Sequence, residues 1–216
     1  STLIYQHQGE FYNSGLALNL YQFMTWSADY APAEHYCLVL WDHGGGFWGC
    51  SIDESHQEYN HFNLDDLNEK LTIFKDKKRI LEVLVFDMCL MSCFEVVAQL
   101  QDCVGYMVAS ENIVNAVTVE GNVFQHILDF YPDYIPSAIQ VANAFVSGFQ
   151  DSFGNAFPFT VIDFEKAGDA VERFDDLWQV LLDNWDHLKH VLTLTRTFMN
   201  YIEGPFLDVH WLVDLK

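Results

Sequence analysis

A histidine and a cysteine each follow a buried strand that the sequence predicts. His43 lies just beyond the apolar run 36–41, and Cys89 lies just beyond the apolar run 80–86. The carboxyl ends of neighbouring parallel strands meet at one edge of a sheet, so we expect both side chains in one cleft. A thiol and an imidazole in one cleft suit nucleophilic catalysis, because the imidazole can accept and return the protons of the reaction.

The position of Cys89 predicts a reactive thiolate. The spacing of Phe94, Val97 and Leu100 predicts an amphipathic helix that begins directly after Cys89. A helix N-terminus and a nearby imidazolium both lower the pKa of a thiol from its ordinary value of about 8.5. In most proteins, however, a lone cysteine after an apolar run is a small core residue, and a lone histidine in a loop is a surface residue. The residue types alone leave both interpretations open.

Two other chemistries fit parts of the same pattern. Cys89 and Cys93 are four apart on a predicted helix and could bind zinc with His43, although zinc sites rich in thiols usually have a two-residue spacing. The run from His43 to Gly46 is similar to the oxyanion loop of esterases. The esterase nucleophile requires a Gly-x-Ser-x-Gly sequence, and the chain has none. The esterase interpretation therefore fails, whereas the zinc site stays an alternative.

Strands and helices alternate along the chain. Besides the two apolar runs, the sequence predicts strands at 104–110 and 157–164. Helices are predicted within residues 1–34, from the capping residue Asn63 onward, and at 137–149 and 165–200, the last with a break near 183–186. The segments 50–61 and 111–120 have the character of loops. This order predicts an α/β sandwich with a mostly parallel central sheet.

The composition indicates a globular protein and excludes several classes of partner. The chain has 216 residues, of which 50% are hydrophobic and 16% aromatic, enough for the core of a single domain. Its net charge of -21 repels nucleic acids and anionic lipids, but would concentrate cationic substrates near a cleft. No apolar run approaches the roughly 20 residues that span a bilayer. The cysteine count of five predicts at least one free thiol and no disulfide framework.

Two segments closely resemble the active-site blocks of the clostripain family of cysteine peptidases. LVLWDHGGGFWG at 38–49 is an apolar strand that ends in His-Gly. LVFDMCLMSCFEVV at 84–97 is an apolar strand that ends in Asp-x-Cys-Leu-Met, with a glutamate a few residues on. A looser similarity extends over about 31–215 and includes the segments PAEHYCLVLW, NLDDLNEKL, VASEN and FLDVHWLVDL.

The resemblance implies a fold and a chemistry. The fold would be the caspase-like α/β/α sandwich shared with gingipains, legumains and separases, and the activity would be endopeptidase cleavage after Arg or Lys. Cys89 would attack the scissile carbonyl, and His43 would protonate the leaving amine. The backbone N–H groups of Gly44 and Cys89 would form the oxyanion hole. Asp87 would lie at the floor of the pocket for the basic side chain.

Strand geometry is consistent with this role for Asp87. Side chains two apart at the end of a strand point to the same side, so Asp87 and Cys89 would face one cleft. The alternative role for Asp87 is to cap the helix predicted after Met88. The resemblance places Glu95 and Asp42 beside the active site, where we expect structural roles for both.

The resemblance further implies one peptidase domain over 1–216 that lacks the family's opening strand and C-terminal extension. The segment NIVNAVTVEGNVF at 112–124 replaces the family's Gly-Trp-rich turn, which keeps a catalytically inactive binding module as an alternative. No cofactor is required, although calcium occurs in part of the family and the acidic loop at Asp53 and Glu54 could bind it. The implied partners are polypeptides with basic residues, and the implied location is secreted or in the bacterial cell envelope.

Overall fold

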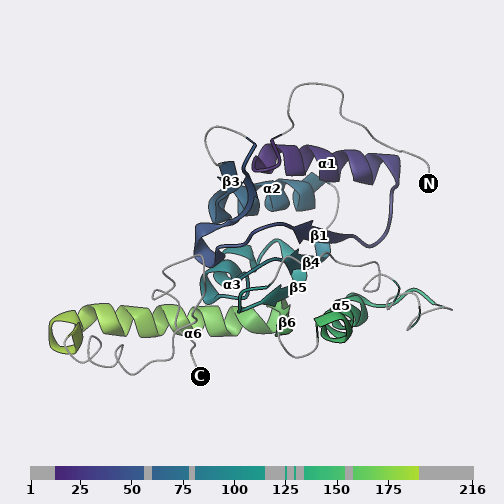
Figure 1. Ribbon diagram of the computed structural model, residues 1–216. Helices are drawn as coiled ribbons and strands as arrows, with labels where there is room; N and C mark the ends of the chain where they lie inside the picture. Colours follow the sequence, from purple (N-terminus) through teal and green to yellow (C-terminus); the bar gives the residue numbers. More distant parts are fainter. Residues whose placement is uncertain are drawn as a thin grey trace. The chain divides into compact units, whose positions relative to one another are not determined.

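The computed structural model describes residues 13–55, 60–77, 81–114, 134–153 and 158–189, with the single residues 125 and 129. The chain divides into two compact units, Ser1–Glu165 and Lys166–Lys216, and each is described by itself. Every strand found among the described residues, with the helices that cover the central sheet, belongs to the first unit. Figure 1 shows this arrangement.

The central sheet of the first unit has the strand order β1-β4-β5-β6. These strands are β1 (Cys37–Trp41), β4 (Leu81–Asp87), β5 (Val104–Ser110) and β6 (Phe159–Asp163). β1, β4 and β5 run parallel, whereas β6 runs antiparallel to β5. The mostly parallel sheet predicted from the sequence is therefore confirmed. Residues 83–87 of β4 are all buried, as expected for a central strand covered on both faces.

Helices cover both faces of the sheet, as Figure 1 shows. One layer consists of α1 (Ala17–Tyr30), α2 (Leu64–Lys77) and α3 (Phe94–Leu100), in which α2 contacts both of the others. α2 and α3 lie in successive connections between neighbouring parallel strands, and right-handed connections that advance in one direction put their helices on the same face. The other layer is α5 (Ala138–Phe153), which packs against β4, β5 and β6.

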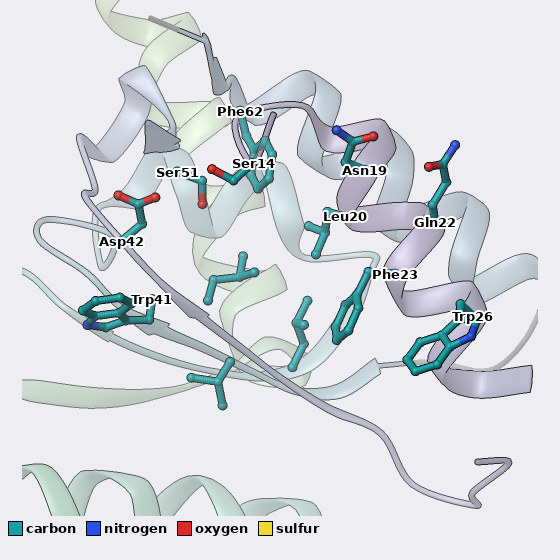
Figure 2. A pocket seen from close by; sticks show the side chains of 13 residues that line it. Ser14, Asn19, Leu20, Gln22, Phe23, Trp26, Trp41, Asp42, Ser51 and Phe62 are labelled. Carbon is teal, nitrogen blue, oxygen red and sulfur yellow. The ribbon is translucent and has the colours of Figure 1, made fainter. Parts of the chain in front are cut away.

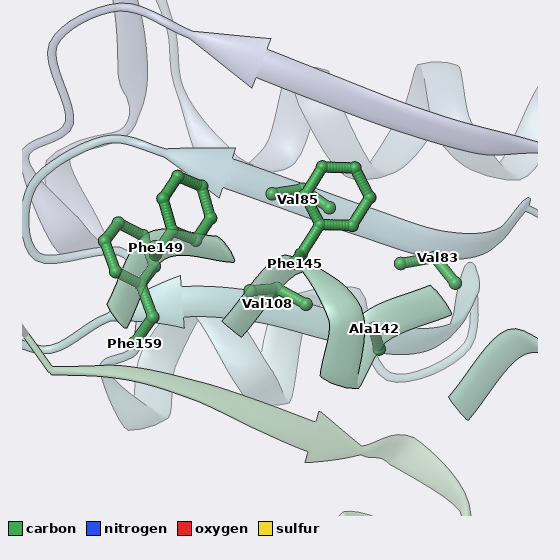
Figure 3. Close-up of a cluster of buried hydrophobic side chains, with 7 residues drawn as sticks. All are labelled: Val83, Val85, Val108, Ala142, Phe145, Phe149 and Phe159. Carbon is green, nitrogen blue, oxygen red and sulfur yellow. The ribbon is translucent and has the colours of Figure 1, made fainter. Parts of the chain in front are cut away.

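The side chains of the strands alternate between the core beneath α5 and the opposite face of the sheet. The buried side chains of this core are Val83, Val85, Val108, Ala142, Phe145, Phe149 and Phe159, shown in Figure 3. The rings of Phe149 and Phe159 stack with centroids 3.9 Å apart, which joins α5 to β6. Because successive side chains of a strand point to opposite faces, Leu84 points away from this core. Leu84 is nevertheless fully buried, which requires the second helical layer on the other face.

A small antiparallel hairpin corrects the loop predicted at 50–61. β2 (Cys50–Asp53) pairs with β3 (Asn60–Phe62), with an irregularity in the register between Cys50 and Asp53. The segment has no clear polar and apolar alternation, so the strand pattern is not visible in the sequence. Asp53 is buried, and its carboxylate accepts hydrogen bonds from Ser14 on one oxygen and Ser55 on the other. The bonds from Ser14 join the hairpin to the residues that precede α1.

Most other elements begin and end within a few residues of their predicted positions. At the start of α2, the backbone N–H of Asp66 donates to Asn63 Oδ1 over 2.7 Å, which confirms the predicted cap. The helix α6 (Phe164–Asp183) begins at the last two residues of the first unit and continues in the second. It ends at Asp183, within the break that the sequence predicts near 183–186. The predicted continuation over 190–200 lies outside the described residues.

All five cysteines are free thiols in the structure. Among the described residues, no helix has the length and apolarity needed to cross a membrane.

Candidate active site

The loop after β1 and the turn after β4 are packed directly against each other. Trp41 and Asp87 are partners in the register of the two strands, so His43 and Cys89 each follow a paired position by two residues. A Cβ atom at Gly44 would lie only 2.2 Å from the carbonyl oxygen of Cys89, a distance that no larger residue could accommodate. The sheet therefore brings the two sequence blocks together at its carboxyl edge.

His43 lies on this loop with an exposed side chain. Its backbone N–H donates to Asp42 Oδ1 over 2.6 Å, and its carbonyl accepts from the backbone N–H of Ser51 over 3.0 Å. Burial raises the pKa of the Asp42 carboxyl, an effect that the hydrogen bond from His43 opposes. These contacts give Asp42 the loop-orienting role expected from the sequence.

Among the described residues, the backbone N–H groups of Gly44 and Cys89 have no acceptor, so each can donate a hydrogen bond to a ligand oxygen. Gly44 and Cys50 form an isolated antiparallel β-bridge. In this bridge, the Gly45 N–H donates to the Gly49 carbonyl, and the Ser51 N–H donates to the His43 carbonyl. The bonds of this bridge are formed by the neighbours of Gly44 and Cys50, so Gly44 and Cys50 are a non-hydrogen-bonded pair. In such a pair, the N–H of Gly44 points away from the segment that contains Cys50. Among the described residues, neither the Gly44 N–H nor the Cys89 N–H donates a hydrogen bond. An oxyanion hole requires two such donors.

The Cys89 thiol contacts the main chain of the loop that follows β5. The backbone N–H of Val114 donates to Cys89 Sγ over 3.2 Å, and the thiol donates to the Val114 carbonyl over 3.4 Å. No hydrogen bond joins Cys89 Sγ to the His43 ring. The sequence analysis missed Val114, because a contact made by main-chain atoms carries no signal in the side-chain type.

The helix predicted directly after Cys89 begins later than expected. α3 starts at Phe94, and its buried residues are Val96 and Leu100. A turn precedes it, in which Leu90 has a positive φ of 64° and its N–H donates to the carbonyl of Asn112 over 3.1 Å. The left-handed conformation of Leu90 interrupts any helix at this point. Cys89 is therefore not at a helix N-terminus, and the expected effect of the helix dipole on its thiol does not apply.

Asp87 is buried beside this turn without capping a helix. It is 5% exposed, and its Oδ2 atom has no hydrogen-bond partner among the described residues. Burial raises the pKa of the Asp87 carboxyl to about 6. The late start of α3 rules out the capping role that was the alternative for Asp87. An unpartnered buried carboxylate costs free energy, and a bound cation would offset that cost.

Asp87 and the Cys89 thiol lie toward the same face of the sheet. Asp87 continues the alternation of Val83 and Val85, which face the core beneath α5. Val114, which holds the Cys89 thiol, also packs against that core. This placement supports the shared cleft expected from the two-residue spacing.

A cavity of about 710 Å³ lies elsewhere, between α1 and β1. Leu20, Phe23 and Trp26 line it from α1, and Trp41 and Asp42 line it at the end of β1, as Figure 2 shows. Neither Cys89 nor Asp87 lines this cavity. It is therefore not the cleft that the sequence predicts.

The described residues contain no group of three or more His, Cys, Asp and Glu side chains that could hold a metal ion. His43, Cys89 and Cys93 thus do not lie together as such a group, which gives the zinc alternative no support. For calcium, both carboxylate oxygens of Asp53 already accept hydrogen bonds from Ser14 and Ser55. A calcium ion at Asp53 would have to displace these donors, and calcium binding stays a prediction.

A mostly parallel sheet between two helical layers, with a histidine loop packed on a cysteine turn at its carboxyl edge, is the architecture of the caspase-like cysteine peptidases. Within this class, the clostripain family model matches residues 2–216, and the chain belongs to the clostripain family. The family and the fold expected from the sequence are thereby confirmed.

Solved structures of this family are similar to the chain in fold. An inactive zymogen C11 protease from Parabacteroides distasonis is 23% identical with a TM-score of 0.56, over 76% of this chain and 44% of that one. A secreted C11 cysteine protease from Bacteroides thetaiotaomicron, in complex with an irreversible peptide inhibitor, is 21% identical with a TM-score of 0.55, over 71% of this chain and 46% of that one. The chain thus spans less than half the length of these two structures. No curated protein matches the chain.

Proposed function

We propose that the chain carries the catalytic residues of a cysteine endopeptidase that cleaves polypeptides after Arg or Lys. The observation that carries the proposal is the packing of Gly44 on the Cys89 carbonyl, which fixes the His43 loop against the Cys89 turn. Membership of the clostripain family supports the reaction class. The secreted protease from B. thetaiotaomicron supports a secreted or cell-envelope location for this chain as well.

In the proposed reaction, His43 accepts the thiol proton of Cys89, and the thiolate attacks the scissile carbonyl. The negative charge that forms on the carbonyl oxygen is stabilised by the free N–H groups of Gly44 and Cys89. His43 then gives its proton to the leaving amine as the C–N bond breaks, which leaves a thioester on Cys89. Water attacks the thioester, His43 accepts a proton from that water, and the thiol is restored as the acid product leaves.

Asp87 is the group proposed to select a basic side chain. Its buried Oδ2 has no partner among the described residues, so a guanidinium or ammonium group could pair with it without displacing another contact. The loss of this pairing would leave the charge buried and uncompensated. The preference for Arg or Lys thus follows from one carboxylate rather than from the general negative charge of the chain.

One observation favours a second candidate, an inactive binding module of the same fold. The Cys89 thiol is hydrogen-bonded to the main chain of Val114 and not to His43. For catalysis, the Cys89 thiol must break its hydrogen bond to the Val114 carbonyl and form one to the His43 imidazole. A chain that could not make this exchange would bind peptides at the site without cleaving them.

A cleavage profile on a peptide library separates the two candidates. Wild-type protein is expected to cut after Arg and Lys, and Cys89→Ala and His43→Ala are expected to lose that activity while staying folded. Cys93→Ser is the matched control, because it removes a neighbouring thiol that has no role in the proposed reaction. Equal turnover by wild type and Cys89→Ala would contradict the peptidase, and peptide binding without cleavage by wild type would favour the binding module.

A further inference from the structure

Two adjacent aromatic side chains are exposed on the loop that carries His43. Phe47 and Trp48 lie on the 3₁₀ turn η1 (Gly46–Trp48), and they are 37% and 65% exposed. Their ring centroids are 5.2 Å apart with an angle of 32° between the planes. Aromatic side chains on a fixed backbone provide a large contact area at a small cost in conformational entropy, and they are enriched where proteins bind polypeptides.

The turn that carries this aromatic pair is fixed to the nucleophile turn. Gly46 has a positive φ of 61°, and a Cβ atom there would lie 3.2 Å from the Leu90 carbonyl oxygen and 3.3 Å from Cys93 Sγ. The backbone N–H of Trp48 donates to the Gly45 carbonyl over 3.2 Å. The positions of Phe47 and Trp48 are therefore set relative to Cys89 by direct backbone packing.

The aromatic pair and Asp87 lie toward opposite faces of the sheet. Asp87 follows the strand alternation toward the core beneath α5, whereas η1 contacts α3, which belongs to the other helical layer. A substrate that places its basic side chain at Asp87 therefore continues past Cys89 toward the His43 loop. His43 must come within reach of the leaving amine to protonate it, so the polypeptide after the cleaved bond runs along this loop.

We propose that Phe47 and Trp48 form a subsite for a large apolar residue directly after the cleaved bond. The inference rests on the proposed function, because it uses His43 as the proton donor to the leaving group. It adds a second determinant of specificity. The preferred substrate is a polypeptide in which Arg or Lys is followed by a residue such as Leu or Phe.

The test compares two peptides that differ only in the residue after Arg, Leu in one and Ser in the other. Wild-type protein is expected to cleave the Leu peptide with a kcat/KM about tenfold higher or more, the usual discrimination of a hydrophobic pocket. Trp48→Ala and Phe47→Ala should bring the ratio close to one, whereas Trp48→Phe should keep part of it. Trp178→Ala is the matched control, since Trp178 is 49% exposed on α6 and should leave the ratio unchanged.

Binding to Cys89→Ala gives a second readout that does not depend on turnover. The Leu peptide is expected to bind this variant more tightly than the Ser peptide, and Trp48→Ala in the same background should remove the difference. A wild-type kcat/KM ratio within twofold, or a ratio that both aromatic substitutions leave unchanged, would overturn the subsite but not the peptidase. If the protein neither cleaves nor binds Arg peptides, both proposals fail.

Discussion

Gly44 lies so close to Cys89 that a Cβ atom on it would be 2.2 Å from the Cys89 carbonyl oxygen. The Cβ of Met88 and the Cγ of Met91 would be 2.9 and 3.0 Å from the same atom, so the position is closed on several sides. The backbone carbonyl cannot rotate away as a flexible side chain could. This contact therefore sets the separation between the histidine loop and the cysteine turn.

Gly44→Ala should abolish most of the peptidase activity. The added methyl group would push the His43 loop away from Cys89, and a displacement of about 1 Å in a catalytic group can cost roughly 100-fold in rate. Overpacking at a closed site also costs about 1–3 kcal/mol of stability. Measurements of kcat/KM on an Arg peptide and of the free energy of unfolding check both effects.

Gly168→Ala is the matched control for this substitution. Gly168 lies in α6, and a Cβ atom there would meet nothing within 4 Å. Alanine in place of glycine inside a helix should raise stability by up to about 1 kcal/mol without changing kcat/KM. Wild-type kcat/KM in Gly44→Ala would show that the contact between the loops does not position the catalytic groups.

Iodoacetamide at pH 7.5 should modify Cys89 in preference to Cys50, Cys93 and Cys103. Burial raises the pKa of Cys50 to about 12 and that of Cys93 to about 11, and burial also raises the pKa of Cys103. Thiols with pKa values near 11 are ionised in fewer than roughly one molecule in 1,000 at this pH. Peptide mass mapping of the labelled protein checks the prediction.

Cys37 is exposed at the start of β1, so the labelling is done in a Cys37→Ser background. In that background, one label per chain is expected, at Cys89, and a covalent peptide inhibitor with a basic residue should prevent it. Preferential labelling of Cys50 or Cys93 would show that the turn after β4 does not carry the reactive thiol.

The central strands could be predicted from the sequence because they contain long apolar runs. The edge of the sheet that carries the candidate site could be predicted with them, because it lies where these strands end. Four consecutive apolar residues precede Asp87 in β4, and such a run is typical of a strand buried on both faces. The hairpin of β2 and β3 could not be predicted, because its buried residues include the polar Ser51 and Asp53, which are held by hydrogen bonds rather than by apolar packing. Its pairing depends on contacts that are distant in the sequence.

The exact surroundings of the nucleophile could not be predicted for a related reason. The positive φ of Leu90 delays α3, although leucine rarely adopts this conformation and nothing in the residue type indicates it. The Val114 contact is made by main-chain atoms of a distant loop. Sequence patterns report side-chain burial well, but they report main-chain geometry mainly through glycine and proline.

Asp87→Asn should stabilise the protein at neutral and alkaline pH. Burial raises the pKa of Asp87 from 3.8 to about 6, so the folded protein holds the proton more tightly than the unfolded chain. The tighter proton binding by Asp87 in the folded state makes its full contribution to the free energy of unfolding below about pH 4. This contribution is lost as the pH rises through 6. Asp87→Asn removes the cost of the buried charge, so its gain in unfolding free energy should be up to about 3 kcal/mol at pH 8 and should shrink toward pH 4.

Chemical denaturation of wild type and Asp87→Asn between pH 4 and pH 8 measures this difference. Asp76→Asn is the matched control, because Asp76 is exposed near the end of α2 and the chemical change is identical. The control should show no such pH dependence. A wild-type stability that rises between pH 4 and pH 7 relative to Asp87→Asn would contradict the burial of an unpaired charge.

The same substitution should destroy the proposed preference for basic residues. Removal of one partner of a buried charge pair costs about 2–5 kcal/mol, which corresponds to roughly a 30-fold to several thousand-fold loss of kcat/KM on Arg and Lys peptides. The loss should appear while the protein stays folded, since the substitution keeps the shape of the side chain. Asp76→Asn should retain wild-type kcat/KM, which separates the effect of Asp87 from that of net charge. If Asp87→Asn cleaves Arg peptides at a near-normal rate, Asp87 does not bind the basic side chain, even should Cys89 be the nucleophile.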